Sequence, residues 1–476
     1  MAGTAAAALV LTVRSLDWAL GHDAPLMHYV ATRLLAGAVP YRDIFDMNFP
    51  GVYLVHLAGL VVAGPGDGGF RALDLAVLAG TLAGLAAALG SFDRWAVGAA
   101  VALFWLYHVS GGAWRAGQRD LILCLPLAWT TAAALADLRT PTRRALLLAG
   151  FGLGTAVWIK PHALLLVPVL GVLALRRPPG ARAAAVAALG LGLAVPAALV
   201  LLWLGRAGAL PAFVDVVLGY LVPLYGRLGR EGLLDVVRRG DLGAWALGGL
   251  GLWALGGLAV LGRRDRRAGL LASGVAYGVL HFALQGKGWE YHLYPFALFA
   301  IALGAAGLGT AVGRGRQVAT ALLLLAFGIS AAGLAAKGAR NLDPAWLRAK
   351  TMRAHAVARA LTPIVARGGT VQVLDTTDGG IHALLLLGAR QPTRFLYDFH
   401  FYHDVGHPYV RALRAELLDG LRRRPPAAVV LFERGWPSGD YGRLQAFPEL
   451  AAWLGAGYRL AVEGEGFRLY AARSDR

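Results

Sequence analysis

The sequence predicts a polytopic α-helical membrane protein with a small α/β domain at its C-terminal end. Hydrophobic residues make up 57% of the 476 positions and charged residues only 16%, whereas soluble domains carry about 25% charged residues. Apolar runs that suit membrane helices of about twenty residues recur as far as residue 336 and then stop. The chain therefore divides into a membrane body at 1–336 and a polar tail at 337–476.

Eleven apolar runs predict about eleven transmembrane helices in the body. They lie near residues 2–20, 72–90, 95–111, 120–137, 145–158, 162–175, 184–204, 243–261, 268–284, 292–311 and 318–336. We interpret 145–175 as a hairpin that turns at Lys160, because one long kinked helix would place a basic cluster on the outer face. Residues 210–225 contain Asp215 and two prolines, which favour an interfacial or re-entrant segment over a twelfth span.

The loops between these runs alternate in character. Longer loops rich in Asp, His, Trp and Tyr are predicted to face outward, and short arginine-rich loops to be cytoplasmic. With a cytoplasmic N-terminus, eleven spans place the tail outside a bacterial plasma membrane. The net charge of +18 does not indicate nucleic-acid binding, because it is spread over loops that suit anionic lipid headgroups. The basic loops contain Arg94, Arg139, Arg143, Arg144, Arg176, Arg177, Arg182, Arg263, Arg264, Arg266, Arg267, Arg314 and Arg316.

The tail has the pattern of an α/β domain. Residues 370–375 and 427–432 are short apolar runs typical of buried strands, and 381–388 is typical of a helix. Residues 458–472 alternate in polarity around a Gly-Glu-Gly turn at 464–466, which predicts a closing hairpin. The tail is therefore predicted to be an extracytoplasmic α/β domain over 337–476.

The first outer loop spans residues 14–71, and its stretch 14–50 is the most polar membrane-proximal part of the chain. It contains two segments that we predict to be juxtamembrane helices, 26–36 and 51–64, the second of which is too short to cross the membrane. An alternative interpretation is an exposed loop whose aspartates cap helices and whose arginines anchor at lipid headgroups.

Three carboxylates in this loop are candidates for chemistry. Desolvation near apolar surface raises the pKa of a carboxylate and makes it a better base, so Asp23 is a candidate general base toward an acceptor hydroxyl or amine. Asp43 and Asp46 are candidates for holding a divalent cation or for orienting the acceptor.

Other outward loops bring cations to the same side of the membrane. Arg119 and Asp120 stand at the start of a span, and Lys160 and Lys287 occupy later turns. Cationic side chains at the membrane edge suit a phosphate headgroup. The aromatic residues beside them are equally typical of an interfacial belt.

Four motifs together resemble the GT-C superfamily of membrane glycosyltransferases. They are HDAP…HY…GAVPYRDIFDMNFPG from His22, QRD from Gln118, the Lys160-Pro161 turn and WEYH-x-YP from Trp289. The sequence is most similar to the family-39-like group, which includes protein O-mannosyltransferases and aminoarabinose transferases that act on lipid A. The resemblance covers most of the membrane body, and the tail is also similar to the outer domains of such proteins.

The resemblance implies an inverting transfer of a hexosyl or pentosyl group from a polyprenyl-phosphate-linked donor on the outer face. Asp23 matches the first-loop base, Asp120 matches the acid that opens the fourth span, and Asp43 and Asp46 fall near the second acidic group. The acceptor, whether protein, lipid or glycan, is left open. The residues that we predict to bind substrate are His22, Tyr41, Arg42, Asn48, Arg119, Lys160, Lys287, Trp289, Tyr291 and His292.

Metal dependence is also left open. Many relatives have paired acids in the first loop, whereas His22 precedes Asp23 in this chain. If Mg²⁺ or Mn²⁺ is bound, we expect Asp23 and Asp120 to hold it.

Two other functions compete with glycosyl transfer. One is a transporter or flippase for lipid-linked sugars, against which the scarcity of charge inside the spans argues. The other is a non-catalytic membrane assembly protein that binds partners through its tail.

Overall fold

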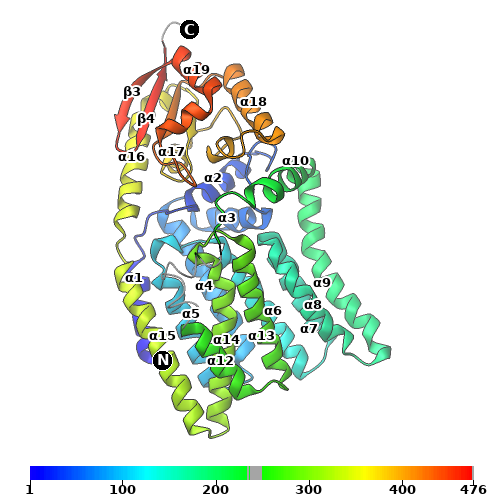
Figure 1. Cartoon of the computed structure of the whole chain (residues 1–476). Helices are drawn as coiled ribbons and strands as arrows, with labels where there is room; N and C mark the ends of the chain where they lie inside the picture. Colours follow the sequence, from blue (N-terminus) through cyan, green and yellow to red (C-terminus); the bar gives the residue numbers. More distant parts are fainter. Residues whose placement is uncertain (233–234, 236–248, 474–476) are drawn as a thin grey trace.

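The computed structural model describes residues 1–232, 235 and 249–473, and shows a helical body with a small domain at one end (Figure 1). Of the run predicted at 243–261, residues 243–248 lie outside the described residues. Each of the eleven predicted runs contains a helix: α1 (Ala2–Arg14), α4 (Asp67–Leu89), α5 (Arg94–Ser110), α6 (Arg119–Arg139), α7 (Arg143–Ile159), α8 (Val167–Leu175), α9 (Pro179–Arg206), α12 (Leu250–Leu261), α13 (Arg266–Gln285), α14 (Tyr294–Gly313) and α15 (Gln317–Arg340).

Within the described residues, six helical segments are long and apolar enough to cross a membrane. They begin at Asp67, Arg119, Pro179, Arg266, Glu290 and Gln317. The helix α14 lies at the centre of the body, where it packs against α5, α12 and α13 and is buried along nearly its whole length. These helices confirm the predicted polytopic membrane protein.

The hairpin predicted at 145–175 is present. The helix α7 ends before Lys160, and the chain returns through the 3₁₀ helix η2 (Pro161–Leu166) and α8. Beyond α8, Arg177 forms an ion pair with Asp137 near the end of α6, and both basic clusters line one cavity. We call this side of the body the basic face, and the opposite side, which carries the α/β domain, the domain face.

Small residues let α7 and α9 approach closely. A Cβ atom at Gly150 would lie 2.4 Å from the Leu189 carbonyl oxygen, and one at Gly192 would lie 2.2 Å from that of Leu147. Without a hydrophobic driving force between helices in lipid, such contacts between backbones are a principal source of stability.

Short helices cover the domain face. The helices α2 (Ala24–Leu35) and α3 (Pro50–Ala63) run across the ends of the spans (Figure 1), as predicted for juxtamembrane helices. The segment predicted to be interfacial forms α10 (Leu210–Asp215) and the π-helix η3 (Val216–Tyr225). It bonds to the α/β domain, since the Tyr409 hydroxyl donates to Asp215 at 2.6 Å. The segment is shorter than the six candidate spans and contacts the α/β domain, as predicted for an interfacial segment.

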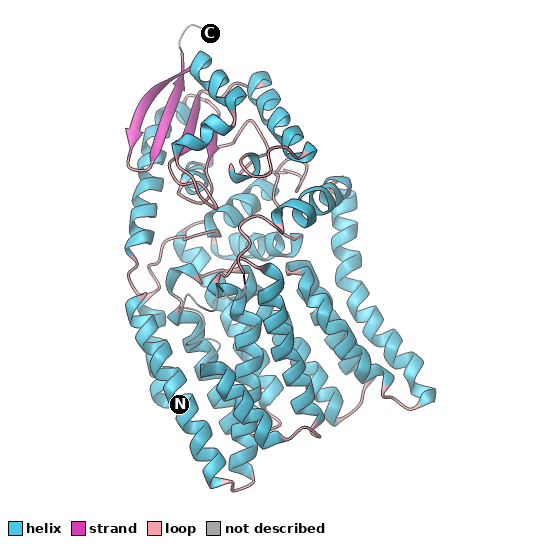
Figure 2. Ribbon diagram, viewed as in Figure 1, coloured by secondary structure: helices cyan, strands magenta, loops and turns pink. Residues whose placement is uncertain are grey.

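The α/β domain contains one four-stranded sheet, drawn in magenta in Figure 2. Strands β1 (Val371–Leu374) and β2 (Ala428–Phe432) are parallel, and the hairpin of β3 (Tyr458–Gly464) and β4 (Phe467–Ala472) adds antiparallel to β2 in the order β1-β2-β4-β3. The strands, the hairpin turn and the helix α17 (Gly380–Leu387) agree with the sequence prediction. The remaining helices are α16 (Ala345–Ala366), α18 (Pro408–Arg423) and α19 (Pro448–Gly457).

The first loop is joined to this domain by backbone contacts. The Phe45 amide donates to the Arg394 carbonyl oxygen at 2.8 Å, and the Arg394 guanidinium donates to the Tyr41 carbonyl oxygen at 2.8 Å. The domain therefore fixes the loop that carries the predicted site.

Candidate functional site

An ion pair between Asp23 and Arg119 forms the centre of the site. Asp23 is the residue that precedes α2, and Arg119 is the first residue of α6. A guanidinium nitrogen of Arg119 lies 2.8 Å from one carboxylate oxygen, and His22 Nδ1 lies 3.2 Å from the other. Burial opposes ionisation of Asp23, but His22 and Arg119 together outweigh it and hold its pKa well below the ordinary value.

A second polar group supports Arg119 from the first loop. Arg119 bonds to the Asn48 side-chain oxygen, and the Asn48 amide donates to both carboxylate oxygens of Asp46. Tyr53 donates its hydroxyl to Asp46 at 2.6 Å, and Tyr41 donates its hydroxyl to the Asn48 backbone at 2.7 Å. Burial raises the pKa of Asp46 despite these bonds. Asp46 and Tyr41 therefore hold Asn48 and, through it, Arg119.

A third group surrounds Asp120, one residue further along α6. Lys160 Nζ lies 3.0 Å from one of its carboxylate oxygens, and His281 Nε2 lies 2.6 Å from the other. Gln285 bonds to Lys160 and, at 2.8 Å, to His281. Burial lowers the pKa of Lys160 to about 8, although Asp120 opposes this shift. Asp120 thus positions a lysine ammonium at the edge of the spans.

These three groups border a cavity of about 260 Å³. Polar side chains of Asn48, Arg119, Lys160, Lys287 and His292 line it together with the apolar residues Leu221, Val222 and Leu284. Several buried polar atoms here have no hydrogen-bond partner within the described residues, which indicates a missing polar ligand. They are Nε of Arg119, Nδ1 of His162 and Nδ1 of His292.

Lys287 reaches the same cavity from the loop that follows α13. Its ammonium donates to the Tyr225 carbonyl oxygen at 2.9 Å and lies 4.6 Å from the Tyr225 ring centre and 5.5 Å from that of Trp436. Trp436, from the α/β domain, also packs on Trp289 with ring centres 5.8 Å apart. Burial lowers the pKa of Lys287 to about 8.

A second cavity, of about 390 Å³, lies on the other side of Asp23. His22 and Trp114 line it from the body, and Trp346 and Lys350 line it from α16. The His22 and Trp114 rings meet edge to face with centres 3.9 Å apart, and the Tyr291 ring lies 6.1 Å from His22. The ion pair of Asp23 thus stands between two cavities.

Two predicted site residues lie outside this arrangement. Arg42 and Asp43 pair with each other at 2.8 Å on an exposed turn. The Arg42 hydrogen bond, which outweighs partial burial, lowers the pKa of Asp43. Sequence proximity to Asp46 suggested a shared role, but the turn directs the two carboxylates to different surroundings.

Three residues of the site were not singled out from the sequence. His281 and Gln285 lie one turn apart near the end of α13, and this spacing at the end of an apolar helix is the only local signal for them. Trp436, which contacts Lys287, lies more than 140 residues beyond His292, the last residue of the cavity lining. No local pattern marks it.

The donor set does not fit a divalent cation held by Asp23 and Asp120. Arg119 and Lys160 already neutralise these two carboxylates. In the part of the chain that the structure describes, no three His, Cys, Asp or Glu side chains gather closely enough to bind a metal ion.

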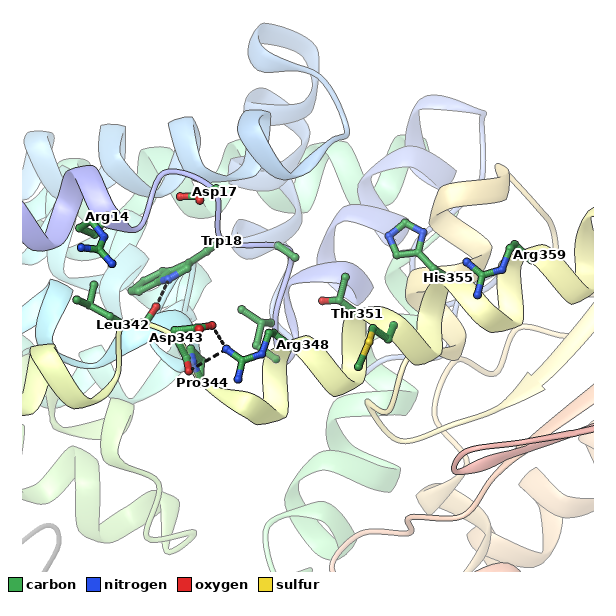
Figure 3. A pocket seen from close by; sticks show the side chains of 13 residues that line it. Arg14, Asp17, Trp18, Leu342, Asp343, Pro344, Arg348, Thr351, His355 and Arg359 are labelled. Carbon is green, nitrogen blue, oxygen red and sulfur yellow. Dashed lines mark hydrogen bonds and ion pairs between the residues drawn. The ribbon is translucent and has the colours of Figure 1, made fainter.

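A larger cavity, of about 760 Å³, lies elsewhere, between the end of α1 and α16 (Figure 3). The Trp18 indole donates to the Leu342 carbonyl oxygen at 2.9 Å at its base. Arg348 pairs with Asp343 at its rim. None of the predicted site residues lines this cavity, so its size does not make it the site of chemistry.

Comparison with known proteins identifies the fold. No family model matches the chain, and no curated protein matches it by sequence. The structure of ArnT from Cupriavidus metallidurans bound to undecaprenyl phosphate matches with a TM-score of 0.62 at 14% identity, over 100% of this chain and 98% of that chain. The apo state of the same protein gives 0.62 at 16% identity, over 99% and 97%.

A third solved structure supports the same fold. Arabinofuranosyltransferase AftD from Mycobacteria matches with a TM-score of 0.54 at 17% identity, over 99% of this chain and 41% of that chain. ArnT and AftD are GT-C membrane glycosyltransferases. The chain therefore shares the fold of ArnT and AftD, in agreement with the resemblance that its sequence motifs indicated.

Proposed function

We propose that the chain is an inverting glycosyltransferase that uses a polyprenyl-phosphate-linked sugar. The observation that carries the proposal is the cavity of about 260 Å³, where cations and orphaned polar atoms meet an apolar wall at the edge of the spans. The proposal places this site on the outer face of a bacterial plasma membrane, with the N-terminus in the cytoplasm.

The cavity suits both ends of such a donor. Arg119, Lys160 and Lys287 offer charge to a phosphate, and Leu284 and Val222 continue the wall toward the lipid. These two apolar side chains are 48% and 65% exposed on the body, which a polyprenyl chain would cover. ArnT was solved with undecaprenyl phosphate bound, which supports the same ligand class here.

The chemistry needs few groups. The phosphate of the donor leaves already ionised, so no strong general acid is required, and cations that bind it lower the barrier. A base on the opposite side of the sugar must take the proton of the acceptor, and the proposal assigns this role to Asp23 with His22, since Asp23 contacts both His22 and the cavity residue Arg119. Displacement from that side inverts the anomeric centre.

A lipid-linked sugar transporter is the second candidate. Buried charges do occur in α4, where Arg71 pairs with Asp74, but both lie in its first two turns. Asp74 also bonds to His108 near the end of α5 and to the Gly117 amide. This network joins the ends of the helices at the domain face, whereas transporters use ionisable groups near the midplane. The placement favours glycosyl transfer.

The test is turnover by the full-length protein in proteoliposomes. Undecaprenyl phosphate carrying arabinofuranose, aminoarabinose, mannose or glucose is supplied as donor, and membrane extract of the source cells as acceptor. Release of undecaprenyl phosphate is expected with at least one donor, and Asp23→Asn should reduce it at least 100-fold. The matched control is Asp419→Asn, an exposed position on α18. Lipid flux across the vesicle without glycosidic product would instead favour a flippase.

A further inference from the structure

The backbone at His22 is held in an unusual conformation. Its φ is 46°, a left-handed value that is uncommon for a residue other than glycine and is retained when surrounding contacts impose it. Lys350 donates to the His22 carbonyl oxygen at 2.8 Å, and the Trp114 ring packs on the imidazole. The α/β domain and the body together fix where this ring points.

The Asp23 contact determines which ring nitrogen of His22 carries a proton. An ionised carboxylate only accepts hydrogen bonds, so the 3.2 Å contact with Asp23 places the proton on Nδ1. The Gln118 amide nitrogen lies 3.4 Å from Nδ1 but is itself a donor, and it donates to the Trp114 carbonyl oxygen at 3.0 Å. Nε2 of the neutral ring then carries the lone pair, and no described residue bonds to it. An acid orients a histidine base in the same way in hydrolase triads.

Asp23 itself is a poor acceptor for a substrate proton. Arg119 and His22 each contact one of its oxygens, and they hold its pKa well below the ordinary value, so this carboxylate is a weak base. His22, in contrast, lines the cavity of about 390 Å³ between the body and the α/β domain. The geometry separates a phosphate side, at Arg119, from an acceptor side, at His22.

The lining of this second cavity suits a carbohydrate. Trp114 and Trp346 meet edge to face with ring centres 5.8 Å apart and offer apolar surface for a sugar ring. The charged side chains of the lining balance: three are cationic and three are acidic, so the cavity favours hydroxyl groups over a net charge. These six side chains are Lys350, Arg353, Arg434, Asp378, Glu433 and Glu465.

We propose that His22 is the general base of the transfer, that Asp23 positions it, and that the acceptor is a sugar hydroxyl bound in the cavity beneath the α/β domain. In this step Nε2 of His22 takes the hydroxyl proton while the acceptor oxygen forms a bond to the anomeric carbon. The bond from that carbon to the phosphate oxygen breaks, and its electron pair leaves with the polyprenyl phosphate. The proton passes from His22 to solvent. The inference rests on the proposed glycosyltransferase function.

The test uses the proteoliposome assay with the donor that wild type accepts. His22→Ala should lower turnover by about 100- to 10,000-fold, while binding of undecaprenyl phosphate stays within twofold of wild type, because the phosphate cavity is intact. Free imidazole should restore turnover of His22→Ala at least tenfold by entering the space left by the ring. His355→Ala, in the larger cavity of Figure 3, is the control and should be neither impaired nor stimulated.

Three other outcomes would overturn parts of the proposal. Turnover of His22→Ala within threefold of wild type, or a loss that imidazole does not reverse, overturns His22 as the base. Asp23→Glu should recover part of the activity lost in Asp23→Ala, because a carboxylate again orients His22, and equal activities of these two variants would contradict the positioning role. If the transferred sugar is recovered on protein or on a lipid phosphate and not on a carbohydrate, the acceptor assignment is overturned. An inactive wild type with every donor refutes the proposed function itself.

Discussion

The affinity for undecaprenyl phosphate should fall steeply as the pH rises above neutrality. Lys160 and Lys287 both line the cavity of about 260 Å³, and burial lowers the pKa of each to about 8, compared with about 10.4 for free lysine. A lowered pKa means that the cation is present below pH 8 and is lost above it. The phosphate loses its charge-assisted hydrogen bonds in the same range.

The size of the effect follows from these values. Between pH 7.5 and pH 9, the charged fraction of one lysine with a pKa of about 8 falls about eightfold, and that of two independent lysines about 70-fold. The dissociation constant is measured with undecaprenyl phosphate in nanodiscs over this range, where the phosphate stays fully ionised. The expected rise is about eightfold if one lysine carries the contact and about 70-fold if both do.

A charge-retaining variant provides the control. Arginine stays protonated throughout this range, so Lys287→Arg should show a shallower dependence, about eightfold at most. Lys350→Arg, outside this cavity, should keep the wild-type slope. An affinity that changes less than twofold between pH 7.5 and pH 9 would refute the assignment of these lysines to the phosphate.

Three further predictions concern the framework. Asp120→Ala leaves the Lys160 ammonium buried without its carboxylate and should lower the free energy of unfolding by about 3–5 kcal/mol. The double variant Asp120→Ala/Lys160→Met should recover most of this loss. Equal unfolding midpoints in denaturant for the wild type and the single variant would contradict the prediction. Gly192→Ala places a methyl group against the backbone of α7 and should lower the free energy of unfolding by about 1–3 kcal/mol. The control Gly190→Ala adds a methyl group that meets nothing within 4 Å, so its thermal melting should match that of the wild type. Arg394→Ala removes a link between the α/β domain and the first loop, so amide exchange in that loop should accelerate, and unchanged exchange would argue against the link.

The site divides into parts that local sequence predicted and parts that it did not. The structure brings five residues that the sequence singled out to one place: Asn48, Arg119, Lys160 and Lys287 line one cavity, and Asp23 pairs with Arg119. The sequence did not indicate which surroundings each carboxylate has in the fold. Asp43 and Asp46 are three residues apart, yet one is on an exposed turn and the other is buried among tyrosines.

The sequence by itself predicted the apolar helices of the body and the strands of the tail, and the structure confirms both. Hydropathy and turn residues act locally, so about twenty residues suffice to specify a span. Only the tertiary structure decided the pairing of Asp120 with His281, 161 positions apart, and the approach of Trp436 to Lys287. Such contacts depend on how helices pack, and no local pattern encodes them. The two cavities on either side of Asp23 exist for the same reason.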